Sequence, residues 1–253
     1  MDNDKSTLTF KVLSALLSYP EQEMIAAIPE MRAALAAEAL LAAPQRKALQ
    51  AFLAELEAGD LYDLQERYVL LFDRTRSLSL HIFEHVHGES RDRGQAMVDL
   101  MALYEKGGLT MAPGELPDFL PLFLEYCATR PLTEARELLG QPAHVLAALA
   151  ERLRKRGSSY EVVFRCLASL AAAAPRAEDL AAVLAEPETD PDDMIALDKI
   201  WEEEAVTFGP GADGQGAQSA MGGCGADALA ARMRHARRAV PTHDNPMSPG
   251  GRP

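Results

Sequence analysis

Residues 60–72 read Asp60-Leu-Tyr-Asp-Leu-Gln-Glu-Arg-Tyr-Val-Leu-Leu-Phe72, and the stretch has the pattern of an amphipathic helix. Asp60 is one of the residue types that cap helix N-termini. After it, apolar side chains recur every three or four positions, which places them on one face of a helix: Leu61, Leu64, Tyr68 and Phe72. The pattern predicts a helix that begins near residue 61 and buries this face.

The same periodicity extends in both directions along the chain. We expect a helix over 8–19 that stops at Pro20, Ala-rich helices over 21–43 interrupted near Pro29, and a helix from Pro44 to Gly59. Further helices are expected over 95–104, ending at Gly107-Gly108, and then from Leu116, over 132–156 and over 160–173. No stretch alternates with period two. The sequence therefore predicts an all-α fold, a single-domain helical bundle of roughly eight to ten helices.

Composition agrees with helices and restricts the function. Of 253 residues 48% are hydrophobic but only 6% are aromatic, which favours helices packed through Ala and Leu over a β-sandwich. The formal net charge is −13. Such an acidic protein repels phosphate backbones, so we expect no nucleic-acid partner; a basic peptide would be attracted.

Cysteines and apolar runs point to a cytoplasmic protein. Cys127, Cys166 and Cys224 are far apart and odd in number, which indicates buried or idle thiols and no disulfide framework. The acidic start and the short apolar run from Val12 to Leu17 do not resemble a signal sequence. No run approaches the length of a membrane span, so we expect no stable membrane insertion.

The composition changes towards the C-terminal end. Residues 178–204 hold eleven acidic residues against the single base Lys199, and 209–225 are rich in glycine. We therefore expect an all-helical domain over residues 5–185, followed over 186–253 by an acidic, then Gly-rich, flexible tail.

A cluster of titratable residues occupies 77–95, which we call the histidine segment. Three of the six histidines fall within seven residues there: His81, His85 and His87. Its charged residues are Glu84, Glu89, Arg91, Asp92 and Arg93. Such a group is typical of a metal site, an acid-base pair or a polar surface that binds a protein.

The enzymatic interpretations of this segment are weak. His81, Glu84 and His85 match the H-x-x-E-H spacing of a zinc hydrolase, since positions one helical turn apart share a face. No third ligand is evident, and no nucleophile elbow or nucleotide-phosphate loop accompanies the serines. Two non-enzymatic alternatives stay open: a solvated, structural helix end, and a polar rim beside an apolar groove that receives an amphipathic helix.

Longer motifs resemble a known family. These are residues 68–73, Tyr68-Val-Leu-Leu-Phe-Asp73; residues 76–97, which contain the histidine segment; residues 115–125, Glu115-Leu-Pro-Asp-Phe-Leu-Pro-Leu-Phe-Leu-Glu125; and residues 201–209. Together they are similar to the NarJ-type nitrate reductase assembly chaperones, a branch of the redox-enzyme maturation proteins. The motifs occur in the family's order over most of the chain.

The resemblance implies a system-specific cytoplasmic chaperone that is not an enzyme and has no cofactor or metal of its own. It would bind the N-terminal peptide of the nitrate reductase catalytic subunit and support molybdenum cofactor insertion before membrane docking. Cofactor-delivery proteins are further candidate partners. The zinc hydrolase remains the alternative function.

The sequence also predicts the residues that contact the client peptide. We expect an apolar groove around Tyr68, Phe72, Leu80 and Phe83, with acidic residues beside it that meet positive charges of the peptide. The predicted acidic contacts are Asp73, Glu84, Glu89 and Asp92. His81, His85 and His87 would hydrogen-bond the peptide or control its release, because histidine changes charge near neutral pH. Arg91 completes the predicted set.

Overall fold

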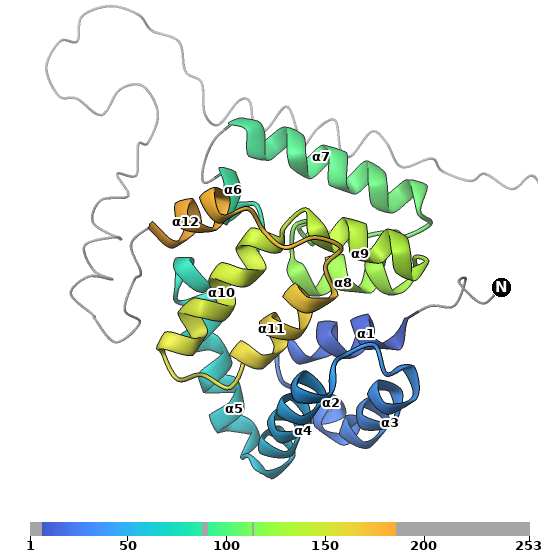
Figure 1. Cartoon of the computed structure of the whole chain (residues 1–253), viewed down its shortest axis with the longest axis vertical. Helices are drawn as coiled ribbons and strands as arrows, with labels where there is room; N and C mark the ends of the chain where they lie inside the picture. Colours follow the sequence, from blue (N-terminus) through green and yellow to red (C-terminus); the bar gives the residue numbers. More distant parts are fainter. Residues whose placement is uncertain (1–6, 88–90, 113, 186–253) are drawn as a thin grey trace, which may run out of the picture. The chain divides into compact units, whose positions relative to one another are not determined.

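The computed structural model of the protein describes residues 7–87, 91–112 and 114–185, and this part of the chain is helical (Figure 1). Its α-helices are α1 (Leu8–Leu16), α2 (Gln22–Ala26), α3 (Ile28–Glu38), α4 (Ala43–Ala58), α5 (Leu61–Tyr68), α6 (Glu84–His87), α7 (Arg91–Lys106), α8 (Leu120–Ala128), α9 (Leu132–Gly140), α10 (Ala143–Lys155), α11 (Glu161–Leu170) and α12 (Ala177–Ala185). A π-helical turn, η1 (Val69–Asp73), continues α5, and a 3-10 turn, η2 (Arg76–Leu78), follows. The predicted all-α class is confirmed.

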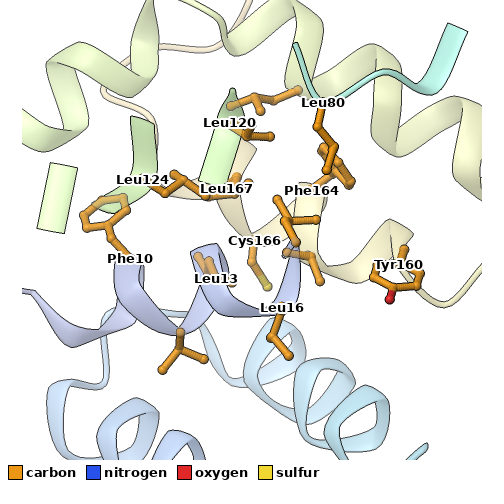
Figure 2. Packing of buried hydrophobic residues seen from close by; sticks show 14 of the residues in the cluster. Phe10, Leu13, Leu16, Leu80, Leu120, Leu124, Tyr160, Phe164, Cys166 and Leu167 are labelled. Atoms are coloured by element: carbon orange, nitrogen blue, oxygen red, sulfur yellow. The ribbon is translucent and has the colours of Figure 1, made fainter. Parts of the chain in front are cut away.

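The core forms around α1 and α11. Phe10 and Leu13 of α1 are completely buried and lie toward Leu124 of α8 and toward Cys166 and Leu167 of α11 (Figure 2), and Leu16 of α1 is also buried. On its other side α11 packs against α10 and α4, and α12 packs on α10. The apolar stripes that predicted these helices are therefore the surfaces by which the helices contact one another.

Two helix ends form as their residue types predict. The Asp60 carboxylate accepts a hydrogen bond from Tyr62 N at 2.9 Å, which caps α5. At the end of α7, Gly108 adopts φ +83°, and Leu109 N donates to Tyr104 O at 2.9 Å. Gly107 lies against a ring, because a Cβ there would be 2.4 Å from Cε2 of Tyr126. The predicted stop at Gly107-Gly108 is confirmed.

The observed helices differ from the expected ones in number and at two boundaries. The structure has twelve α-helices in the described residues, more than the predicted eight to ten. The single helix expected over 132–156 is two, because Pro142 lacks an N–H group and separates α9 from α10. The helix expected from Leu116 begins at Leu120, which leaves Pro117 in a turn and Pro121 in the first helical turn, where proline is tolerated.

Other sequence predictions concern the termini and the thiols. The predicted tail over 186–253, including residues 201–209 and Cys224, lies outside the described residues, so the boundary at 185 stays a prediction. Cys127 and Cys166 are buried free thiols, as expected, and burial raises the pKa of each to about 12. None of the described helices combines the length and the apolar composition required to span a bilayer.

Candidate functional site

The histidine segment and the 115–125 motif lie side by side, although residues 96–114 of the chain separate them. His81 and Phe119 form an antiparallel bridge, with Ile82 N donating to Asp118 O at 3.0 Å and Leu120 N to Leu80 O at 2.9 Å. The imidazole of His81 also packs against the Phe119 ring, with 5.5 Å between the ring centroids. The two longest motifs that resemble the chaperone family therefore make one surface.

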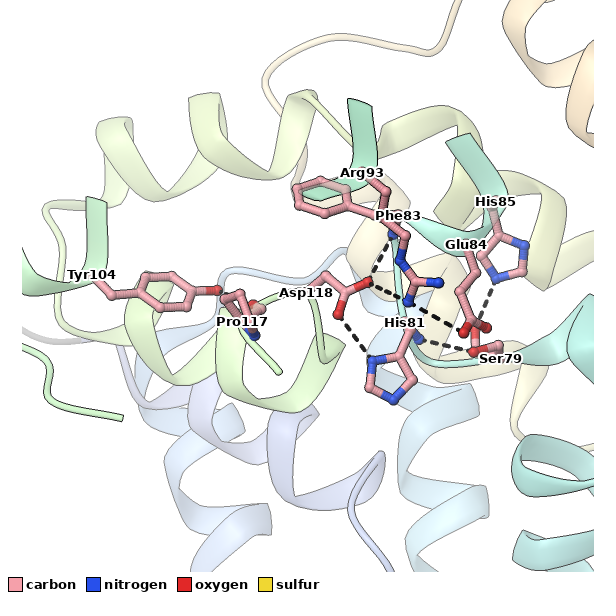
Figure 3. A network of polar contacts seen from close by, with 9 residues as sticks. All are labelled: Ser79, His81, Phe83, Glu84, His85, Arg93, Tyr104, Pro117 and Asp118. Atoms are coloured by element: carbon pink, nitrogen blue, oxygen red, sulfur yellow. Dashed lines mark hydrogen bonds and ion pairs between the residues drawn. The ribbon is translucent and has the colours of Figure 1, made fainter. Parts of the chain in front are cut away.

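Asp118 is the centre of this surface (Figure 3). Its side chain is completely buried and receives Nδ1 of His81 at 3.0 Å and the backbone N of Phe83 at 3.3 Å. Arg93 Nη2 lies 3.6 Å from Asp118 Oδ2 and donates to Glu84 Oε1 at 3.3 Å. We call these four ionisable residues, Asp118, His81, Arg93 and Glu84, the Asp118 cluster.

Burial explains why the cluster has this composition. A carboxylate removed from water requires hydrogen-bond donors and positive charge in compensation. An ionised carboxylate only accepts, so the ring proton of His81 is on Nδ1. The hydrogen bond to Asp118 is the largest cause that raises the pKa of His81; partial burial opposes it, and the charges of Asp118 and Glu84 support it against Arg93. The cluster therefore favours the protonated imidazole.

The same region holds α7 at both ends. Arg93 in its first turn contacts the Asp118 cluster, and Tyr104 in its last turn donates a hydrogen bond from its hydroxyl to Pro117 O at 2.8 Å. Tyr104 also packs on Tyr126 of α8, with 4.9 Å between ring centroids. Between these ends, Met97, Leu100 and Leu103 are only half-buried. Helix α7 is thus fixed by its termini and packed loosely along its middle.

An exposed apolar and acidic surface accompanies α7. Its exposed large apolar side chains come from α6, from α7 and from the loop before α8: Val86, Val98, Met101 and Leu116. Exposed acidic residues lie on α7 and on the same loop: Asp92, Asp99, Glu105 and Glu115. We call this set, together with half-buried Phe83, the α7 surface. Its chemistry suits a peptide with both apolar and basic side chains.

Three of the four residues predicted to line the groove are in the core instead of on this surface. Tyr68, Phe72 and Leu80 are 4–5% exposed. The Phe72 ring lies 5.0 Å from Tyr68 and 5.1 Å from Tyr160, and the Tyr68 hydroxyl donates to Leu17 O at 2.9 Å. A peptide reaches these rings only if the core opens, so their contact with a client stays a prediction.

The remaining predicted residues are distributed around the Asp118 cluster. His81, Phe83 and Glu84 are half-buried, whereas Asp73 and Asp92 are exposed. His85 is buried, and its Nε2 donates to Ser79 O at 2.8 Å. Glu89 and the side chains of His87 and Arg91 lie outside the described part of the structure. The structure therefore brings together His81, Phe83 and Glu84, and it gives His85 a structural hydrogen bond.

The geometry does not produce the zinc arrangement considered from the sequence. His81 is in the bridge to Phe119 and precedes α6, so His81 and His85 are not one turn apart on a helix. Figure 3 shows their rings directed to different partners, Asp118 and Ser79 O. In the described residues no group of three or more His, Cys, Asp or Glu side chains is placed to hold a metal ion.

Two important residues of the cluster were not identified from the sequence. Arg93 belongs to the histidine segment but was not among the predicted client contacts; its side chain is 23% exposed and contacts Glu84 and Asp118. Asp118 lies within the 115–125 motif, but no role was predicted for it. The sequence did contain one indication of its role, because Asp118 is an acidic residue between Pro117 and the apolar side chains of α8. An acidic side chain that is buried at such a position requires hydrogen-bond donors as partners.

Comparison with known proteins identifies the class. The family model described as nitrate reductase delta subunit matches residues 30–165, a range that contains the whole Asp118 cluster. The chain therefore belongs to this family, that of the NarJ-type chaperones.

Individual relatives are named as assembly chaperones. The chain is 44% identical over 240 residues to the nitrate reductase molybdenum cofactor assembly chaperone NarJ of Escherichia coli (strain K12), with 95% of this chain and 97% of that protein covered. It is 40% identical over 198 residues to the probable chaperone NarW of the same strain, with 78% and 82% covered. The probable chaperone NarJ of Bacillus subtilis (strain 168) is 32% identical over 174 residues, with 67% and 92% covered. The resemblance inferred from the motifs is confirmed.

Proposed function

We propose that this protein is a chaperone, not an enzyme, that acts in the cytoplasm on a respiratory nitrate reductase and supports insertion of its molybdenum cofactor. The observation that carries the proposal is the 44% identity that extends over 97% of a protein named for that role. The acidic composition, −13 overall, supports capture of a basic segment of the reductase.

The client segment we propose is the N-terminal peptide of the catalytic subunit, bound as an amphipathic helix. Its apolar side would pack on Phe83, Val86 and Met101 of the α7 surface, because these side chains are partly or largely exposed. Its basic residues would contact Glu84 and Asp92, with Asp73 on the neighbouring η1 turn as a further acidic contact. Apolar burial at about 25 cal/mol per Å² would supply most of the affinity.

Tyr68, Phe72 and Leu80 enter this proposal as the inner part of the site. All three are buried in the core, and Leu80 is held beside α8 because Leu120 N donates a hydrogen bond to its carbonyl. A client that displaces α7 and the 79–85 segment would expose them. His81 would then control release, because its protonation strengthens the contact with Asp118 that keeps this segment closed.

Calorimetric titration of the full chain with the synthetic N-terminal peptide of a nitrate reductase catalytic subunit tests the proposal. We expect a one-to-one complex whose affinity falls with salt. A scrambled peptide of the same composition is the matched ligand control. Absence of binding at low salt and across pH 6–8 would sink the proposal.

A pair of variants tests the location of the site. Met101→Lys places a positive charge on the α7 surface, whereas Tyr62→Lys makes a similar change at an exposed aromatic residue of α5. Loss of a partly buried methionine contact, on the order of 1 kcal/mol, corresponds to about fivefold weaker binding. We expect that loss for Met101→Lys and an unchanged affinity for Tyr62→Lys; equal effects would place the peptide elsewhere.

A further inference from the structure

The two ends of α7 are held by contacts of different kinds. Tyr104 in the last turn and Arg93 in the first turn contact consecutive residues, Pro117 and Asp118, and reach them from opposite sides (Figure 3). Helix α7 therefore lies across the 117–118 pair and is joined to it by one side chain at each end. The strength of each contact decides which end of the helix is free to move.

Buried aromatic packing fixes the last turn. Tyr104 is completely buried, and its ring centroid lies 4.9 Å from that of Tyr126, whose hydroxyl donates to Leu103 O at 3.2 Å. Gly107 lies so close to the Tyr126 ring that a Cβ has no room there, and Arg130 Nη2 donates to Gly107 O at 2.8 Å. We call Tyr104, Tyr126, Gly107 and Arg130 the Tyr104 anchor. Two packed rings with bonded hydroxyls make this end of α7 costly to release.

The first turn is held by charged contacts that water reaches. Arg93 Nη2 lies 3.3 Å from Glu84 Oε1 and 3.6 Å from Asp118 Oδ2, and the side chains of Arg93 and Glu84 are 23% and 25% exposed. Such ion pairs are weak, because water screens the attraction. The described side chains over 92–103 are half-buried or exposed, and a Cβ at Gly94 would meet no described atom within 4 Å. The first turn therefore leaves the bundle at a lower cost than the last.

The connection after α7 permits rotation about the anchor. Gly108 is exposed, adopts φ +83°, and has no described atom within 4 Å of the position of a Cβ, so its backbone dihedrals change without a clash. At about 1.5 Å per residue, the first turn of α7 is roughly 16 Å from Tyr104. A rotation of about 20° around Tyr104 would thus move the first turn by roughly 6 Å.

We infer that α7 is a lid that pivots on the Tyr104 anchor and opens at its first turn, and that Arg93 is the positioning residue that keeps it closed. Opening uncovers half-buried Met97 and Leu100 and frees Glu84 for a basic group of the client. The inference rests on the proposed function for the client that holds the lid open, whereas the motion is a property of the chain alone. Loss of the Arg93 contacts favours the open state and hence tightens binding of the client.

Pulsed electron paramagnetic resonance measures the motion between pairs of spin-labelled cysteines introduced into the full chain. The background variant Cys224→Ser keeps Cys127 and Cys166, which are buried and therefore do not take up the label. One label of each pair is at exposed Gln95, near the first turn of α7, or at exposed Ala102, near the anchor.

The second label of each pair is at an exposed reference position, Arg154 of α10 or Lys47 of α4, so that displacement in more than one direction is detected. In the Arg93→Gln variant without any client, we expect a population in which the Gln95 distances differ from those of the unsubstituted chain by roughly 5 Å. The Ala102 distances should change by only roughly 1 Å, because Ala102 is close to the pivot.

Two further variants serve as controls. Lys106→Gln removes the charge of an exposed residue in the last turn of the same helix and should keep the distances of the unsubstituted chain. Arg93→Lys keeps the charge and should restore the closed distances. Unchanged Gln95 distances in Arg93→Gln would show that α7 stays closed, and equal changes at Gln95 and Ala102 would show that it leaves as a whole. Either result would overturn the lid, and neither depends on the proposed function.

Titration with the N-terminal peptide of a nitrate reductase catalytic subunit adds a measurement that a merely structural role of Arg93 would not move in this direction. We expect about threefold tighter binding by Arg93→Gln, because this variant has already lost the contact that the peptide must break. Unchanged or weaker binding would overturn the role of Arg93. Absence of binding in both chains would refute the proposed function, and the label distances would still decide whether α7 is a lid.

Discussion

Replacement of Asp118 by asparagine removes the charge at the centre of the cluster and keeps its shape. The amide oxygen of Asp118→Asn still accepts from Phe83 N, which lies 3.3 Å from the carboxylate. What is lost is the charged hydrogen bond from His81 at 3.0 Å and the weaker contact with Arg93 at 3.6 Å. A hydrogen bond to a charged group contributes about 1.5–3 kcal/mol. The Arg93 contact, with a partly exposed guanidinium, adds less than about 1 kcal/mol.

We therefore expect Asp118→Asn to lower the free energy of unfolding by about 3 kcal/mol at pH 6. The folded protein raises the pKa of His81, so the stability from this pair is fully present below the unfolded pKa of about 6.5. It is lost as pH rises through the higher, folded pKa. The cost of Asp118→Asn should consequently be smaller at pH 8.5 than at pH 6.

Urea unfolding followed by circular dichroism at both pH values measures this difference, with a thermal scan as a second readout. At about 2–4 °C per kcal/mol for a domain of this size, the melting temperature should fall by about 6–12 °C at pH 6. Asp73→Asn is the control, because Asp73 is exposed and such changes cost less than about 0.5 kcal/mol. A loss below 1 kcal/mol, or the same loss at both pH values, would refute the account of the Asp118 cluster.

Three further predictions concern the rest of the bundle. Arg152→Met should destabilise the fold by about 2 kcal/mol in urea unfolding, because buried Arg152 donates to Ser77 O at 2.8 Å and to Val183 O at 2.5 Å. Unchanged stability of this variant would contradict the prediction. Phe72→Ala should cost about 3–5 kcal/mol in the same assay, since the ring is in the aromatic core; a cost below 1 kcal/mol would show that the ring is not packed there. In native-state hydrogen exchange, amides in the middle of α7 should exchange faster than those of α11, and equal protection would mean that α7 is an integral part of the core.

The sequence predicted the helical class because its apolar side chains recur with the period of a helix. The same periodicity does not show whether an apolar helix face is buried in the core or lines a peptide-binding groove. Tyr68 and Phe72 satisfy both descriptions, because a helix that lines a peptide groove and a helix that faces the core show the same spacing. The rings of Tyr160 and Phe164, which lie in a later part of the sequence, decide the matter because they pack against Phe72.

The contacts within the Asp118 cluster could not be predicted from the sequence for a related reason. The residues near His81 in the chain offered Glu84, Glu89 and Asp92 as partners, and proximity in sequence favours such pairs. The actual partner, Asp118, is 37 positions away. It is brought close by the β-bridge between His81 and Phe119, which the hydrophobic periodicity of the sequence does not predict. The resemblance to a family pointed to both segments, but it did not indicate that they touch.

In the proposed complex the exposed side chains of the α7 surface supply part of the apolar contact with the client, and displacement of α7 would supply more. Among the described side chains of α7 only Tyr104 is fully buried, whereas five residues of α11 are: Val163, Phe164, Cys166, Leu167 and Leu170. Fully burying one such side chain stabilises a helix contact by about 1.5–3 kcal/mol, so releasing α11 would cost most of the stability of a domain.

Releasing the first turns of α7 breaks mainly the contacts of Arg93 and uncovers half-buried Met97 and Leu100. Those contacts are charged, and a basic client offers replacement charges to Glu84 and Asp118, so the loss is offset at the moment of binding. Helix α7 is therefore the element of this bundle that a basic, amphipathic peptide displaces at the lowest cost.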